Sequence, residues 1–127
     1  MALAAASQSA GSIEGHWFNP QRTVIIRVAP CGEAMCGTVT WAAERAQHAA
    51  RKGADALVGA RLLDDFKPSG SGEWRGTVFV PDMDLRVGGK IRVMDDNRLK
   101  VSGCILKGLM CRSQVWTRSG GAVSARD

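Results

Sequence analysis

The chain has 127 residues, of which 45% are hydrophobic and 23% are charged, and its formal net charge is +5. This composition is close to ordinary globular usage and excludes a disordered chain or a coiled coil. No run approaches the roughly 18 to 20 apolar residues that a membrane-spanning helix needs, so we expect no membrane span. The length suits one domain.

Both ends of the chain are rich in small and polar residues. Residues 1–7 have the small-residue character of a signal-peptide cleavage region, although the basic start and the apolar stretch that precede such a region are missing. We interpret residues 1–11 as the disordered remnant of a trimmed leader and residues 119–127 as a flexible tail. A single folded domain is then predicted over residues 12–118.

Short segments in which apolar and polar residues alternate indicate half-buried strands. They are residues 23–28, 36–41, 74–80, 90–94, 99–103 and 111–118. Residues 56–63 are predicted as a further strand that ends at Asp64 and Asp65. The 15 glycines, spread between these runs, suit turns and bent strands better than helices.

Residues 42–52 break the alternating pattern because they are rich in alanine and end before Gly53, a favourable residue for a helix C-terminus. A short helix is predicted there. Its apolar face holds only alanine, so it buries little area and depends on contacts with the rest of the domain.

Seven or eight short strands with mostly tight connections can close into a small antiparallel up-and-down β-barrel. Closure removes the unpaired strand edges that promote aggregation, and an eight-stranded barrel has room for side chains or one small ligand. The predicted class is therefore all-β, with one short helix.

The four cysteines form two close pairs, Cys31 with Cys36 and Cys104 with Cys111. Four cysteines allow three disulfide connectivities, and the local one needs the least chain organisation. Each short loop would add about 2 kcal/mol of stability. A zinc site is the alternative, but the gaps of four and six residues compare with about two to four in structural zinc sites. Oxidised pairs predict a periplasmic or secreted protein.

No catalytic constellation is visible in the sequence. Neither His16 nor His48 has a partner at a convincing ligand spacing, and Glu44 with His48 suits a surface pair on a helix better than a catalytic dyad. No glycine-rich phosphate loop is present. We therefore predict a protein that is not an enzyme and that carries no cofactor and no metal.

A barrel of this size has an apolar pocket as its default binding site. Residue parity selects five candidates for its lining, Trp41, Trp74, Val78, Ile91 and Val93. The alternative role for Trp41 and Trp74 is to fill the core. The predicted function is binding of a small, apolar molecule in the barrel interior.

Basic residues gather late in the sequence and support a second hypothesis. Eight of them, against two aspartates, fall between Arg86 and Arg118. A basic sheet face could serve an envelope interaction module, without an internal ligand, that binds an acidic polymer, surface or protein. The solvated face of a half-buried sheet explains the same pattern. Nucleic acid is not expected as a partner of an exported protein, and we expect a monomer.

Several motifs resemble one bacterial exported family, the domain of unknown function 2147. They are Gly15-His16-Trp17, Cys31-x4-Cys36-Gly37-x-Val39, Gly103-Cys104 and Gln114-x-Trp116-Thr117-Arg118, within residues 13–118. The resemblance implies a lipocalin-like (calycin-like) barrel and no established activity. It also implies that Trp17 plugs one barrel end and that Arg118 lies across it, both as structural residues. The alanine-rich residues 42–52 depart from the family pattern, which carries an Asp and an Asn-Pro segment there, and their role is open.

Overall fold

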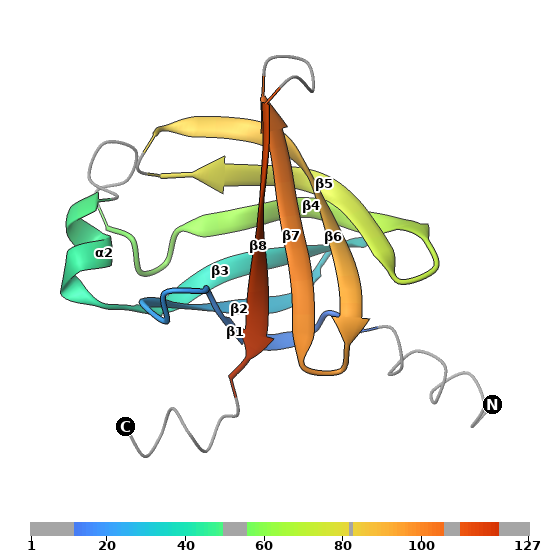
Figure 1. Ribbon diagram of the computed structural model, residues 1–127, viewed down its shortest axis with the longest axis horizontal. Helices are drawn as coiled ribbons and strands as arrows, with labels where there is room; N and C mark the ends of the chain where they lie inside the picture. The colour runs from blue at the N-terminus through green and yellow to red at the C-terminus, as the bar shows by residue number, and fades with distance from the viewer. Residues whose placement is uncertain (1–11, 50–55, 82, 106–109, 120–127) are drawn as a thin grey trace.

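The structure is a computed structural model that describes residues 12–49, 56–81, 83–105 and 110–119. Eight strands and one short helix occur in chain order (Figure 1). They are β1 (Gly15–Phe18), β2 (Val24–Cys31), β3 (Ala34–Ala42), α2 (Glu44–Ala49), β4 (Arg61–Gly70), β5 (Glu73–Val80), β6 (Leu85–Asp95), β7 (Arg98–Ile105) and β8 (Met110–Arg118).

Each strand pairs antiparallel with the next, and β8 returns to pair with β1, so the sheet is a closed barrel. The predicted all-β, antiparallel up-and-down barrel is therefore confirmed. The seam between the first and last strands is short and consists of the residue pairs Trp17–Arg118 and Phe18–Thr117.

The connections alternate between the two ends of the barrel because consecutive strands run in opposite directions. The β2–β3, β4–β5 and β6–β7 turns lie at one end, which we call the closed end. The ends of β1, β3, β5 and β7 lie at the opposite end, which we call the mouth. Figure 1 places α2 at the mouth, beside the start of β4 and the end of β5.

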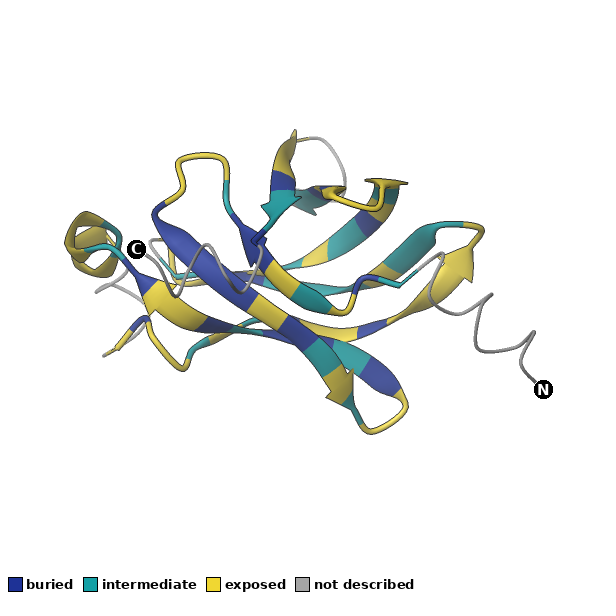
Figure 2. Cartoon of the chain, turned by 90° about the horizontal axis from the view of Figure 1, so that it is seen from below, coloured by how far each residue is buried: buried dark blue, intermediate teal, exposed yellow. Residues whose placement is uncertain are grey.

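Each strand carries both buried and exposed residues, as Figure 2 shows in dark blue and yellow. Trp17, Phe66, Ile91 and Leu99 are 0% exposed and belong to one core cluster. The Phe66 ring lies against Gly76, where a Cβ atom would come within 2.6 Å of the Asp64 carbonyl oxygen and 2.6 Å of the Phe66 Cδ1 atom. A glycine at this position therefore leaves the space that the ring occupies.

Strand β4 differs from its prediction at both ends. Residues 57–59 form a turn, with Gly59 at φ +94°, so the strand starts at Arg61. It also continues through Asp64 and Asp65 to Gly70. The register shifts between Asp64 and Lys67, and Asp65 has φ +56°, so the two aspartates form an irregularity within the strand instead of ending it.

Helix α2 is shorter than the predicted residues 42–52. Ala42 belongs to β3 and pairs with Val24, and the helix covers Glu44–Ala49. The predicted end at Gly53, the predicted leader remnant and residues 120–127 of the predicted tail lie outside the described residues. Ser119 is 5% exposed, and its backbone N–H donates to the His16 carbonyl oxygen at 2.8 Å.

Candidate functional site

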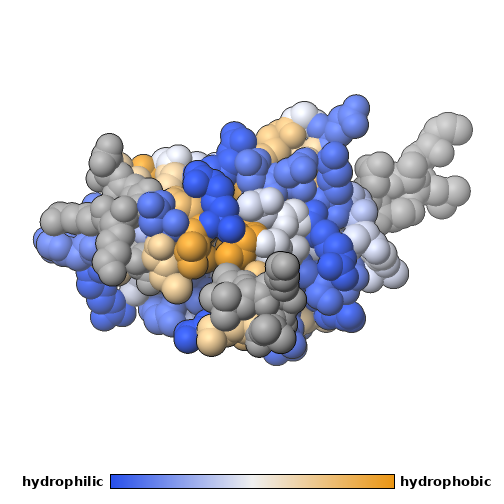
Figure 3. Space-filling view, turned by 90° about the horizontal axis from the view of Figure 1, so that it is seen from above, coloured by the Kyte–Doolittle hydropathy of each residue, from blue (hydrophilic) through white to orange (hydrophobic). Residues whose placement is uncertain are grey.

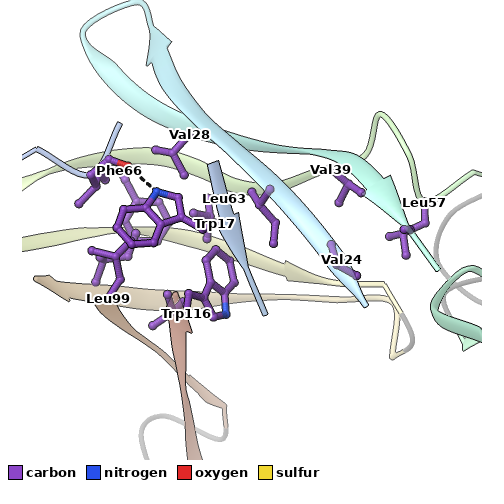
Figure 4. Close-up of a cluster of buried hydrophobic side chains, with 14 residues drawn as sticks. Trp17, Val24, Val28, Val39, Leu57, Leu63, Phe66, Leu99 and Trp116 are labelled. Atoms are coloured by element: carbon purple, nitrogen blue, oxygen red, sulfur yellow. Dashed lines mark hydrogen bonds between the residues drawn. The ribbon is translucent and has the colours of Figure 1, made fainter. Parts of the chain in front are cut away.

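The closed end is organised around Trp17. Its indole Nε1–H donates to the Ile13 carbonyl oxygen at 2.9 Å, the contact marked by the dashed line in Figure 4. The Arg118 guanidinium carbon lies 4.2 Å from the ring centroid, and its nitrogens donate to the carbonyl oxygens of Glu14 at 2.9 Å and Asp96 at 2.7 Å. Arg118 thereby joins β8 to the segment before β1 and to the β6–β7 turn.

Replacement of Arg118 by alanine is expected to lower the free energy of unfolding by about 2 kcal/mol, because one cation–π contact and two charged hydrogen bonds disappear. Urea denaturation measures the change. The matched control is Arg92→Ala, which removes an exposed ion pair with Glu73 and should cost about 0.5 kcal/mol or less. Equal costs for the two variants would contradict the role of Arg118 at the closed end.

A cavity of about 600 Å³ opens at the mouth. Its walls come from β2, β4, β5, β6, β7 and β8, with α2 and the segment before β4 completing the lining. Its apolar lining includes Val24, Ile26, Leu57, Leu62, Val78, Phe79, Val87, Val101 and Trp116. The volume lies within the usual range of small-molecule sites, about 300 to 1,000 Å³.

Strand β8 lines this cavity from the rim to its floor with Met110, Arg112, Gln114 and Trp116. These alternate positions share one face of the strand. Met110 is 50% exposed and Trp116 is 5% exposed, so the wall becomes more buried with depth. The Trp116 Nε1–H donates to the Gln114 Oε1 atom at 2.9 Å, which satisfies the buried indole.

Hydrogen bonds order the described parts of the mouth. The Asn19 Oδ1 atom accepts from the backbone N–H groups of Thr23 and Val24 at 2.8 and 2.9 Å. The Ala43 N–H donates to the Thr23 carbonyl oxygen at 2.7 Å, and the Gln47 side chain donates to the Ala42 carbonyl oxygen at 3.1 Å. These bonds hold the start of α2 against the β1–β2 connection.

The five predicted lining residues fall in different places. Val78 lines the cavity. Ile91 is in the core cluster, and Trp74 and Val93 pack against it, so these three side chains fill the barrel interior outside the cavity. Trp41 is 44% exposed and does not line the cavity that the described residues form.

A register shift explains the position of Trp41. Ile26 pairs with Val39 while Ile25 pairs with Trp41, so β3 holds one extra residue at this point. Ile26 points into the core, and its neighbour Ile25 points to the outer face. The bulge therefore turns Trp41 to the same outer face, where simple alternation along β3 would have placed it inside.

The sequence reasoning did not select several residues that line the cavity. Val87 and Val101 lie on the inward parity of β6 and β7, and Trp116 lies on the face already shared with Gln114, so alternation could have found them. Arg45 on α2 also lines the cavity, but no signal in the sequence brings that helix to the mouth.

The structure contains two local disulfides, Cys31–Cys36 with a Cα–Cα distance of 5.8 Å and Cys104–Cys111 with 4.0 Å. The first closes the β2–β3 turn, and the second joins directly paired residues of β7 and β8. All four sulfurs are bonded, so the alternative of a four-thiolate zinc site does not apply to this oxidised chain.

The late basic residues do not form one free face. Lys90 and Arg92 both contact Glu73, and Arg98 contacts Asp95, whose pKa is lowered by the hydrogen bond from Arg98. Arg86 lies 4.5 Å from the Phe79 ring centroid. Among the described members of the group, two remain without an ion pair or ring contact: Lys100, and Arg112, which lines the cavity.

Exposed apolar residues occur at the rim of the cavity, namely Met83, Leu85 and Met110. In Figure 3, apolar side chains in orange lie directly beside strongly hydrophilic ones in blue on the face seen from above. Within the part of the chain that the structure describes, no helix has the length and hydropathy to cross a membrane.

The fold is that of a lipocalin-like barrel. The structure is similar to protein HP1028 from the human pathogen Helicobacter pylori, described as belonging to the lipocalin family, with a TM-score of 0.69 and 9% identity over 91% of this chain and 88% of that chain. Residues 15–118 match the family of uncharacterized proteins conserved in bacteria, DUF2147, and the chain belongs to this family. The predicted family resemblance is thus confirmed. No curated protein matches the chain.

Proposed function

We propose that the protein binds a small, apolar molecule in the barrel cavity and acts as a binding protein, without catalysis. The observation that carries this proposal is the cavity of about 600 Å³ with its largely apolar lining. Burial of apolar ligand surface there would supply about 25 cal/mol per Å² before the costs of association.

The distribution of the core supports the same proposal. A chain of this size gains most stability by filling its interior, yet the packed side chains of Trp17, Phe66, Ile91 and Leu99 leave the space at the mouth open. The hydrogen bonds around the β1–β2 connection order one part of the mouth before binding, which lowers the ordering cost.

Export to the periplasm or the cell exterior is part of the proposal. Disulfides form and persist in oxidising compartments and are rare in the cytosol. The two local disulfides of this chain support such a location. Thiol labelling of protein in intact cells tests it, because quantitative labelling of all four cysteines without reductant would overturn this part.

Val87→Trp is expected to fill the cavity and to weaken binding of the neutral dye Nile red at least tenfold. Val87 lines the cavity, and so does Val78, its paired residue on the adjacent strand β5. An indole in place of the isopropyl group occupies the volume that the dye would use. Titration followed by dye fluorescence measures the affinity.

The matched control is Lys100→Trp, which adds the same indole at an exposed position outside the cavity lining. This variant should keep the dye affinity of the unmodified protein. Near-ultraviolet circular dichroism checks that both variants are folded. Unchanged dye affinity in folded Val87→Trp, or absence of dye binding to the unmodified protein, would overturn the proposal.

A further inference from the structure

The cavity lining contains two arginines, Arg45 on α2 and Arg112 on β8, in a wall that is otherwise mostly apolar. Among the described residues that line the cavity, none is aspartate or glutamate. Neither guanidinium group has an ion pair, a hydrogen bond or a ring contact with another described residue. Neither arginine is therefore paired with an acidic side chain of the described protein.

Four acidic side chains of the described chain form ion pairs, and none of these pairs involves a residue that lines the cavity. Glu73 contacts both Lys90 and Arg92, and the aspartates at 64, 65 and 95 each contact a basic neighbour. Arg45 and Arg112 thus border the cavity without an acidic partner among the described residues, and an anionic group of a ligand would supply one.

Along β8, the polar side chains of Arg112 and Gln114 line the cavity nearer its opening than the ring of Trp116 does. Arg112 pairs with Gly103, and both residues line the cavity. Trp116 lies four residues deeper, about 14 Å along an extended strand. Gln114 lies between them, and its Oε1 atom accepts a hydrogen bond from the Trp116 indole N–H.

Both arginines are exposed, so their guanidinium groups stay hydrated while the cavity is empty. A ligand with an anionic oxygen group can replace that water by charge-assisted hydrogen bonds, which guanidinium forms readily with carboxylate and phosphate. A neutral ligand offers no such replacement, and a cationic one meets repulsion.

We infer that the ligand is an amphiphile whose apolar chain enters the cavity toward Trp116 and whose carboxylate or phosphate group is attracted by the positive charge of Arg45 and Arg112 and held at the mouth by Arg112. This inference rests on the proposed function, because it specifies the chemistry of the molecule bound at that site.

The test compares probes that share one tail and differ in the headgroup: dodecanoate, dodecyl phosphate, dodecanol and dodecyltrimethylammonium. Calorimetric titration below the micelle concentrations gives each affinity. We expect at least one of the two anions to bind at least tenfold tighter than dodecanol, and the cation to bind weakest. The order of the two anions tells whether carboxylate or phosphate is preferred.

Arg112→Gln is expected to weaken binding of the preferred anion about tenfold or more and to leave dodecanol affinity unchanged, because a charged hydrogen-bond donor is lost while the apolar wall remains. Arg45→Gln on α2 provides a second variant should the strand substitution disturb folding. Arg75→Gln, at an exposed arginine of β5 outside the cavity lining, is the matched control and should change neither affinity.

The outcomes separate this inference from the proposed function. Equal affinities of the four probes, all lost in Val87→Trp, would overturn the inference about the headgroup and leave the apolar site standing. A preference for anions that survives in both arginine variants would overturn the assignment to these residues. If none of the probes bound, the inference and the proposed function would both fail.

Discussion

Phe66→Ala is expected to lower the free energy of unfolding by about 3 to 5 kcal/mol, the range found when a fully buried aromatic ring is removed from a packed core. Phe66 is 0% exposed and belongs to the core cluster with Trp17 and Leu99. The surrounding strands are fixed by their closed register, so they can collapse little into the space that the ring leaves. Urea denaturation at constant pH measures the loss.

Trp41→Ala is the matched control for this prediction. It also removes a large aromatic side chain from a strand, but Trp41 is 44% exposed on the outer face. We expect a cost of at most about 1 kcal/mol. A loss in Trp41→Ala as large as that in Phe66→Ala would mean that the bulge in β3 does not turn this side chain outward.

Gly76→Ala is expected to cost about 2 to 3 kcal/mol although it adds a single methyl group. The new Cβ atom would lie 2.6 Å from the Asp64 carbonyl oxygen and 2.6 Å from the Phe66 ring. The ring could turn, but the carbonyl belongs to the neighbouring strand β4 and can move only if that strand moves. Thermal unfolding followed by circular dichroism measures the effect.

Gly88→Ala makes the same chemical change on the adjacent strand β6, where a Cβ atom would meet no atom within 4 Å. It should leave stability unchanged or raise it by up to about 1 kcal/mol, because alanine has less conformational freedom to lose on folding. The difference between the two variants measures the cost of the close contacts around Gly76. Similar effects of both variants would contradict the prediction for Gly76→Ala.

Alternation of apolar and polar residues carried most of the fold prediction. Residues 74–80 and 90–94 alternate over most of their length, and the structure shows them in β5 and β6. The sequence did not indicate which part of the interior is filled. Trp74 and Ile91 share the inward parity of Val78, and all three pack in or against the core, yet only Val78 also borders the cavity. Parity gives the direction of a side chain and not its depth along the barrel.

Residue patterns in the sequence could not predict two features of the site. The bulge near Trp41 depends on how β3 pairs with β2, a long-range property that alternation within one strand does not contain. The position of Arg45 depends on where the short helix is held by the bonds between Ala43 and Thr23 and between Gln47 and Ala42. Tertiary contacts decide such placements, and local propensity carries no information about them.

The alternation of connections between the two barrel ends also affects how such a protein can diversify. Residues that border the cavity come from the β1–β2, β3–β4 and β5–β6 connections, whereas Trp17 and Arg118 lie at the opposite end. Changes of length or composition in those connections alter what enters the barrel without disturbing strand register or the tryptophan plug. Selection, or a protein engineer, can therefore vary specificity and stability almost independently in this scaffold.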